Sequence, residues 1–294
     1  KYGDMNYYGD GIDLNREVSI QYYKLYRSIS TEKHISSNDQ TAEAINKKVI
    51  QNYKTTADNG NIEAMTKYAS ILYNGKGINS NKKKASEYYK MAADRGNTEA
   101  MIKYASMLYE GDGIIVDKKE AANYYKMSAV NGIIESMLKY ASMLYNGEGI
   151  DINKIESSKY YKMAADSGNL NAMKKYALMI INKEGIQNNL NEAISYIKMA
   201  ADKDDTESMN IYTSIMEYCV DVPNNKNEAI KYIKKASLKG DYLALIKYLH
   251  ILETGQNNEF SKEEIAKCMK ISADNGNFEA INSYADMLYE GKYI

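Results

Sequence analysis

The chain has 294 residues, a formal net charge of −1 at pH 7, 26% charged residues and a single proline. A charge this close to zero argues against a general nucleic-acid binder or a protein that binds anionic membranes. No apolar run is long enough to cross a bilayer, so we expect no membrane span. The two cysteines, Cys219 and Cys268, form no metal or redox motif, which favours a reducing compartment.

A pattern of residues recurs every 36 positions and dominates the sequence. One glycine marks the same place in six copies of the pattern: Gly60, Gly96, Gly132, Gly168, Gly240 and Gly276. Asp204 takes this place in the copy between Gly168 and Gly240. Self-similarity at a fixed period of this size is typical of a solenoid, in which each unit stacks on its neighbours. About eight such units fit in the chain.

Each unit begins with a predicted amphipathic helix. In the unit that starts at Gly60, Asn61 is the expected N-cap and Gly75 the expected end, since Asn accepts hydrogen bonds from the first turn and glycine adopts the left-handed conformation cheaply. A tyrosine on the apolar face recurs in every unit: Tyr68, Tyr104, Tyr140, Tyr176, Tyr212, Tyr248 and Tyr284. At helical spacing, these tyrosines are predicted to be core residues and not a binding stripe.

A second helix is predicted between Asn81 and Gly96. Three residues after its N-cap position, a glutamate recurs in five units: Glu120, Glu156, Glu192, Glu228 and Glu264. This spacing predicts a capping box, in which the glutamate side chain reaches back to the N-cap N–H. Each unit is therefore an expected αα-hairpin that must stack to bury its apolar face. The predicted fold is all-α, a right-handed α/α superhelix whose first helices line a concave side.

The complete pattern resembles the Sel1-like repeat family. In one unit it is carried by Ala92, Ala93, Gly96, Ala100, Tyr104, Ala105, Leu108, Tyr109, Gly111, Gly113, Ile114, Ala121, Tyr124 and Tyr125. The resemblance covers nearly the whole chain, although Tyr replaces the common Trp. Tetratricopeptide repeats differ, since they are 34 residues long and lack the paired loop glycines. The resemblance implies a tetratricopeptide-like solenoid that acts as an adaptor or scaffold for protein complexes.

The units differ in regularity, although we expect one solenoid over residues 1–294. The expected parts are a partial first repeat at 1–27, an irregular repeat at 28–58, regular repeats at 59–203, degenerate repeats at 204–260, and a last helix with a truncated final repeat at 261–294. Within the irregular repeat, 28–40 is predicted as a shortened helix or a structured loop, and 41–58 as a second helix.

A column of lysines on the first helices is the candidate partner-binding surface: Lys67, Lys103, Lys139, Lys175 and Lys247. On one interpretation, these lysines form a basic ladder on the concave side that binds an acidic peptide. On the other, Glu63, Glu99 and Glu135 pair with the lysine four residues later, each pair contributing about 0.2–0.5 kcal/mol. We favour the second interpretation, because the glutamates cancel most of the field.

A further apolar column also recurs on the first helices: Ile71, Met107, Met143, Met179, Ile215, Ile251 and Met287. It could pack on the next unit or line an adaptable binding groove. We favour packing.

No nucleophile–base arrangement, pair of catalytic carboxylates, phosphate loop or metal-ligand set stands out in the sequence. We therefore expect no enzyme activity, no cofactor and no metal, and hypothesise a cytoplasmic scaffold that binds other proteins within a multi-protein complex. Two alternatives stay open: a fixed structural component of a cytoskeletal or axonemal assembly, and the regulatory repeat region of a larger enzyme such as a kinase. The degenerate stretches 28–40 and 204–260 are the better candidates for a binding surface.

Overall fold

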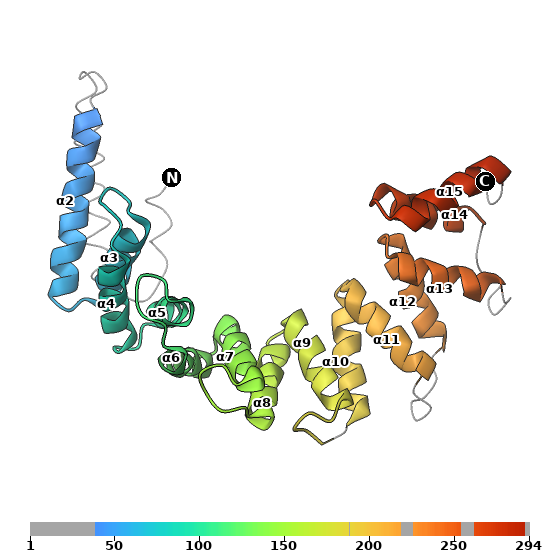
Figure 1. Ribbon diagram of the computed structural model, residues 1–294, viewed down its shortest axis with the longest axis horizontal. Coiled ribbons are helices and arrows are strands. Elements are labelled where there is room, and N and C mark those ends of the chain that lie inside the picture. The colour runs from blue at the N-terminus through green and yellow to red at the C-terminus, as the bar shows by residue number, and fades with distance from the viewer. Residues whose placement is uncertain (1–38, 188, 219–225, 254–261, 292–294) are drawn as a thin grey trace, which may run out of the picture. The chain divides into compact units, whose positions relative to one another are not determined.

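The computed structural model describes residues 39–187, 189–218, 226–253 and 262–291, and every element of regular structure in these ranges is an α-helix (Figure 1). The helices are α2 (Asp39–Asp58), α3 (Ile62–Asn74), α4 (Lys82–Ala93), α5 (Thr98–Glu110), α6 (Lys118–Val130), α7 (Ile134–Asn146), α8 (Lys154–Asp166), α9 (Leu170–Ile181), α10 (Leu190–Asp202), α11 (Thr206–Tyr218), α12 (Lys226–Leu238), α13 (Tyr242–Glu253), α14 (Lys262–Asp274) and α15 (Phe278–Glu290). The predicted partial repeat at 1–27, residues 28–38 and Cys219 lie outside these ranges. Within them, no helix is both long and apolar enough to span a membrane.

The chain divides into two units, one that ends at Asn81 and one that begins at Lys82. In the described part of the first unit, α2 packs against α3. The second helix predicted for 41–58 is confirmed, because α2 covers it. In the second unit, each helix from α4 to α15 packs against the next one along the chain. The predicted αα-hairpins and their stacking into an all-α solenoid are thereby confirmed.

Two helix types alternate along the chain. The first helices are α3, α5, α7, α9, α11, α13 and α15, and the second helices are α4, α6, α8, α10, α12 and α14. The first helices begin as predicted: the side chain of Asn97 accepts a 2.8 Å hydrogen bond from the backbone N–H of Ala100. They also end as predicted, since Gly111 has a left-handed φ of 73° and its N–H donates to the carbonyl of Met107.

The capping box predicted for the second helices forms only in half. The side chain of Asp117 accepts a 2.8 Å hydrogen bond from the backbone N–H of Glu120, as expected. However, the N–H of Asp117 donates to the carbonyl of Leu108 at 2.9 Å, in the preceding first helix. The N-cap N–H is therefore already satisfied, and the glutamate side chain is left for another contact.

That contact is a lysine of the preceding repeat. Lys90 of α4 lies 2.7 Å from Glu120 of α6, and its Nζ lies 5.2 Å from the ring centroids of both Tyr104 and Tyr124. The same ion pair repeats along the second helices as Lys126–Glu156 at 3.0 Å, Lys162–Glu192, Lys198–Glu228 at 2.5 Å and Lys234–Glu264 at 2.8 Å. We call this series the inter-repeat ladder.

A pair of tyrosines lies beside four of the five rungs described above. Tyr104 and Tyr124 meet edge to face with centroids 5.0 Å apart, and three later pairs repeat this geometry: Tyr140–Tyr160, Tyr176–Tyr196 and Tyr212–Tyr232. The hydroxyl of Tyr212 also donates a 2.6 Å hydrogen bond to Glu228. The hydrogen bond from Lys198, followed by that from Tyr212, lowers the pKa of the Glu228 carboxyl. Each rung thus joins three helices.

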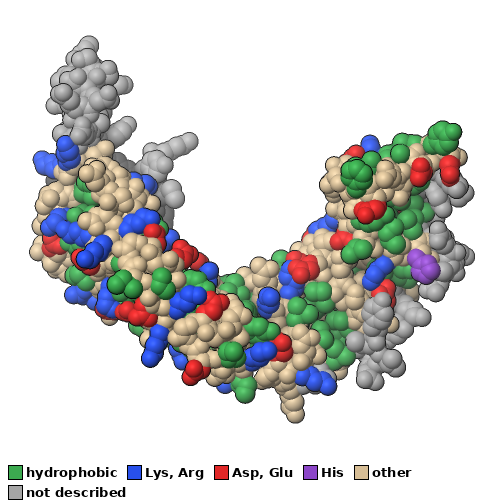
Figure 2. Space-filling model, viewed as in Figure 1, with side chains coloured by type: hydrophobic (Ala, Val, Ile, Leu, Met, Phe, Trp, Pro, Cys, Tyr) green, Lys and Arg blue, Asp and Glu red, His purple; other side chains and the backbone are tan. Residues whose placement is uncertain are grey.

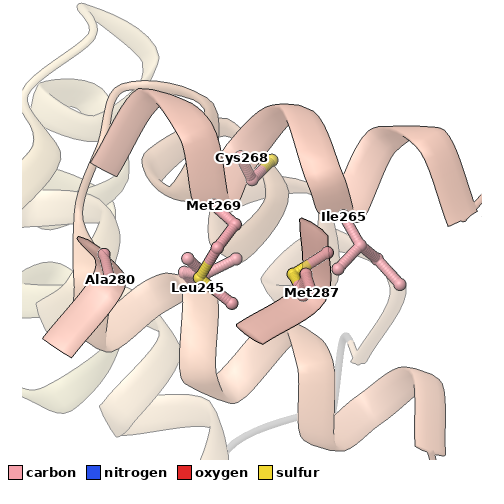
Figure 3. Close-up of a cluster of buried hydrophobic side chains, with 6 residues drawn as sticks. All are labelled: Leu245, Ile265, Cys268, Met269, Ala280 and Met287. Carbon is pink, nitrogen blue, oxygen red and sulfur yellow. The ribbon is translucent and has the colours of Figure 1, made fainter. Parts of the chain in front are cut away.

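The tyrosine column of the first helices is core, as predicted: six of its members are buried and Tyr284 is half-buried. The outer apolar column also packs as we favoured, with Met107, Met143, Met179, Ile215 and Met287 buried. Near the end of the chain, α13, α14 and α15 share a buried cluster (Figure 3) made of Leu245, Ile265, Cys268, Met269, Ala280 and Met287. Burial there raises the pKa of the Cys268 thiol.

The second loop glycine is required by a close contact between neighbouring repeats. At Gly149, φ is 75°, and a Cβ would lie 2.6 Å from the carbonyl carbon of Lys118 and 2.8 Å from the backbone nitrogen of Lys119. The left-handed conformation persists even where another residue replaces a repeat glycine, with φ of 58° at Lys183 and 69° at Asp204. The repeat therefore keeps its backbone conformation at these two positions although the glycine is replaced.

We expect Gly149→Ala to lower the free energy of unfolding by about 2 kcal/mol, because alanine would be strained at positive φ and its Cβ would collide with the start of α6. Gly132→Ala is the matched control: its φ is 87°, but no atom lies within 4 Å of the added Cβ. Gly132→Ala should lower the free energy of unfolding by only about 1 kcal/mol, the cost of placing alanine at positive φ. Urea unfolding followed by circular dichroism measures both losses, and equal losses would contradict the proposed loop contact.

A second prediction concerns the tyrosines of the second helices. The hydroxyls of Tyr124, Tyr196 and Tyr232 donate to Asp94, Asp166 and Asp202 of the preceding second helix. Val130, 67% exposed, occupies the corresponding place for Tyr160. We expect Val130→Asp to raise the free energy of unfolding by about 1 kcal/mol, because it provides the missing acceptor. In a Tyr160→Phe background the gain should disappear; a gain that persists would point to a general charge effect.

Candidate protein-interaction surface

The first helices of the second unit leave one face outside the stack. On α5 it is marked by Glu99 and Lys103, which are exposed, and by Ile102, which is half-buried. We call the residues at these three positions of α5, α7, α9, α11 and α13 the uncovered face. The opposite side of each first helix is occupied by the buried tyrosine, alanine and methionine columns.

The predicted lysine column lies on this face, apart from Lys67, which belongs to α3 in the first unit. Lys67, Lys103, Lys139 and Lys175 are exposed, and Lys247 is half-buried. Lys247 pairs with Glu217 at 2.9 Å, and the Nζ of Lys139 lies 5.8 Å from the ring centroid of Tyr109.

The pairing that we favoured for these lysines does not take the form of close ion pairs in the described residues. Among the described residues, Glu63, Glu99 and Glu135 form no ion pair with the lysine four residues later. An exposed pair on a helix gains little, because solvent screens the attraction and both long side chains lose freedom. The lysines on α5, α7 and α9 are therefore not neutralised by direct contacts with these glutamates.

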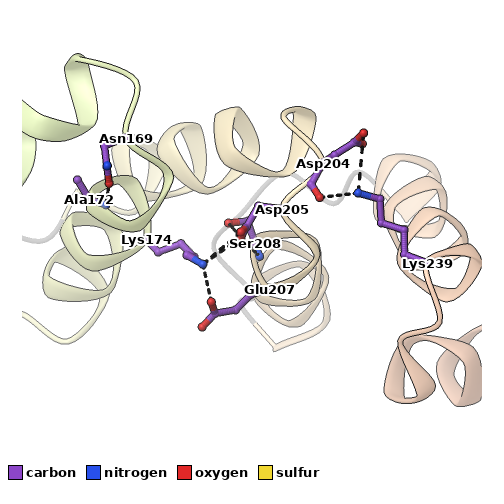
Figure 4. A network of polar contacts seen from close by, with 8 residues as sticks. All are labelled: Asn169, Ala172, Lys174, Asp204, Asp205, Glu207, Ser208 and Lys239. Atoms are coloured by element: carbon purple, nitrogen blue, oxygen red, sulfur yellow. Dashed lines mark hydrogen bonds and ion pairs between the residues drawn. The ribbon is translucent and has the colours of Figure 1, made fainter. Parts of the chain in front are cut away.

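A polar network at the start of α11 joins it to α9 (Figure 4). Lys174 reaches from α9 to Asp205 at 3.2 Å and to Glu207 at 2.5 Å, and its side chain is only 12% exposed. Asp205 also caps α11, since it accepts a 2.9 Å hydrogen bond from the backbone N–H of Ser208. The hydrogen bonds from Ser208 and Lys174 outweigh the opposing effect of burial and lower the pKa of the Asp205 carboxyl. This network has a structural role.

The uncovered face changes character at α11. Ile211 stands at the lysine position, and a shallow pocket of about 390 Å³ opens on this side of the helix. Its lining consists of Glu207, Asn210, Ile211, Ser214 and Ile215. On the neighbouring α13, Leu243 replaces the glutamate and is 72% exposed, while Ile246 is 44% exposed. Hydrophobic side chains gather over α11 to α13 in Figure 2.

The sequence indicated that 204–260 is degenerate, but it did not reveal this pocket. One signal was available: Ile211 interrupts the lysine column. A second signal is the residue of the second helix that pairs with a serine of the preceding first helix. The side chains of Ser106 and Ser142 hydrogen-bond with Tyr125 and Tyr161 of the following second helix, whereas Ile233 occupies that position after α11.

A metal centre is not a feature of the described residues, which hold no group of three or more His, Cys, Asp or Glu side chains able to bind an ion together. The chemistry of the uncovered face is that of a surface for contacts: charged groups over α5 to α9, with lysines beside Glu99 and Glu135, then aliphatic groups over α11 and α13.

Comparison with known proteins places these features in a family. A family model described as Sel1 repeat matches residues 1–25, 62–97, 98–132, 134–169, 171–205 and 220–241. No curated protein matches the chain. A protective antigen of uropathogenic Escherichia coli, which displays an SLR fold, superposes with a TM-score of 0.64 at 19% identity, covering 83% of this chain and 52% of the antigen. The chain thus spans about half the length of that antigen.

A Sel1 repeat protein from Oxalobacter formigenes superposes with a TM-score of 0.59 at 19% identity, covering 80% of this chain and 99% of that protein. At such identities the two structures establish the fold alone. The family model, in contrast, matches more than half of the sequence in consecutive repeats. The chain therefore belongs to the Sel1 repeat family.

Proposed function

We propose that this protein is a non-catalytic scaffold that binds other proteins through the uncovered face of its first helices. The observation that carries the proposal is the exposed lysine column on α5, α7 and α9, which forms no ion pair with the residue four positions earlier and leads into the apolar pocket on α11. Repeats of this family generally build protein-interaction scaffolds. A cytoplasmic location and membership of a multi-protein complex are parts of the proposal.

Physical reasoning supports the use of this face. A lysine without an ion pair can bind a partner's carboxylate without breaking an existing contact. The side chains are held on regular helices, so little backbone freedom is lost on binding. On the other side of the stack, one lysine of each second helix from α4 to α12 is already engaged in the inter-repeat ladder. Binding there would compete with the contacts that stack the repeats.

Site-specific photo-crosslinking of the whole chain tests the proposal. A photoreactive amino acid at Lys103 or Lys175 lies on the uncovered face, and one at Met127 or Met163, which are 44% and 41% exposed, lies on the second helices. In lysate of the source cells, we expect protein adducts from the first pair and few from the second. Equal labelling from both pairs, or none from either, would contradict the proposal.

Neighbouring lysines on α9 separate binding from stability. Lys174→Ala should lower the free energy of unfolding by about 1–2 kcal/mol, because Asp205 and Glu207 lose a charge-assisted partner. Lys175→Ala should change it by less than about 0.5 kcal/mol, since Lys175 is exposed. We expect Lys175→Ala nevertheless to reduce the crosslinking yield from position 103 to captured partners. A large loss of stability in Lys175→Ala would contradict its assignment to binding.

A further inference from the structure

We propose that the apolar part of the uncovered face, on α11 and α13, binds an amphipathic helix of another protein, with aliphatic residues on one side and a carboxylate that meets Lys175. We call this part the apolar groove and define it by the half-buried Ile211 and the exposed Leu243 and Ile246, with the buried Ile215 in the lining of the α11 pocket. The inference rests on the proposed function and specifies the partner's chemistry.

The groove combines residues of two adjacent first helices. Asn210 of α11 donates a 2.8 Å hydrogen bond to Asp241, the residue before α13, and Lys247 of α13 pairs with Glu217 of α11 at 2.9 Å. These contacts hold α11 and α13 side by side. The aliphatic side chains of Leu243 and Ile246 therefore lie next to the α11 pocket and not on a separate surface.

The aliphatic side chains of the apolar groove stay partly in contact with water after folding, which is unfavourable. Leu243 is 72% exposed and Ile246 is 44% exposed, although Glu99 and Glu135 occupy the position of Leu243 on α5 and α7. Covering apolar surface is favourable by about 25 cal/mol per Å². Adjacent exposed aliphatic residues beside a pocket are typical of a surface that a partner covers.

The extent of the pocket along α11 suits a helical partner. Residues 207, 210, 211, 214 and 215 follow the spacing of one helix face, so the pocket runs along α11 for about two turns. A partner helix with aliphatic residues at i, i+3 or i+4, and i+7 presents a ridge of matching pitch. An apolar ridge of this length would cover both Ile211 and Leu243.

The charges around the groove determine the partner's polar side. Glu217 is paired with Lys247, and the carboxylates of Asp205 and Glu207 are held by Lys174. Lys175 is exposed, forms no ion pair with the described residues, and follows Asn171 where α5 and α7 have glutamate. Lys175 contributes to the lowered pKa of Glu184 but remains the exposed cation on the α9 side, and a carboxylate on the partner would complement it.

Selection from a phage-displayed library of random 16-residue peptides on the intact chain tests the inference. We expect the selected peptides to carry aliphatic residues at helical spacing and at least one flanking Asp or Glu. Fluorescence anisotropy with a selected peptide then gives the dissociation constant for each variant. Leu243→Asp should weaken binding at least about tenfold, since an apolar contact becomes a buried charge. Lys175→Glu should weaken it about threefold or more, and the loss should shrink at high salt.

Ile155→Asp is the matched control, because Ile155 is 59% exposed and lies on the second helix α8. It should leave the dissociation constant unchanged. Leu243 is largely exposed, so Leu243→Asp should retain the wild-type unfolding curve and a folding defect can be recognised. The inference is overturned if no peptide is selected, if selected peptides lack the aliphatic spacing, or if Leu243→Asp binds them as tightly as wild type.

The two proposals can fail separately. Should the peptides fail while position 103 still yields protein adducts, the scaffold function stands and the apolar groove is not its helix-binding site. Should both fail, the uncovered face is not a binding surface at all.

Discussion

The stack of repeats depends on the ion pair between second helices of neighbouring units. Lys90 and Glu120 are separated by 30 residues in the chain and by 2.7 Å in space, and the same pair recurs down the second helices. Lys90 also lies near two tyrosine rings, and Lys126 and Lys162 repeat such contacts, so these rungs combine an ion pair, cation–π contacts and burial of the rings. An isolated surface ion pair contributes little to stability, because forming it costs side-chain entropy. Where aromatic side chains already hold the lysine in place, that entropy is lost on packing and not on forming the pair.

The ladder gives the two helix types different roles. It engages one lysine of each second helix from α4 to α12, whereas the first-helix lysines on α5, α7 and α9 take no part in it. The ladder also persists in the degenerate repeats, as Lys198–Glu228 and Lys234–Glu264 show. What changes in those repeats is the uncovered face, where Ile211 and Leu243 replace charged residues. The sequence can thus vary on one side of the solenoid without loss of stacking on the other.

Local features of the fold were predictable from the sequence, and contacts between repeats were not. The bounds of α3 and α5, their asparagine caps and their terminal glycines depend on a few adjacent residues, so the 36-residue pattern was enough to place them. The role of Glu120 was only half predicted, because its spacing suits a capping box but its side chain binds Lys90. Periodicity shows that two columns recur, but it does not show which columns meet across the stack.

For the candidate site, the sequence showed where the surface changes but not what the change means. Erosion of the pattern in 204–260 identified where the surface departs from the regular repeat, but erosion alone does not distinguish a damaged unit from a specialised one. The structure provides that distinction: Asp204 keeps the left-handed backbone of the glycine it replaces, with φ of 69°, and Tyr212 keeps its edge-to-face partner Tyr232. A unit that retains its backbone conformation, its aromatic pair and its ladder rung is a folded repeat and not a damaged one. The exposed aliphatic residues Leu243 and Ile246 lie on the neighbouring α13, and the proposed partner that covers them would explain their exposure.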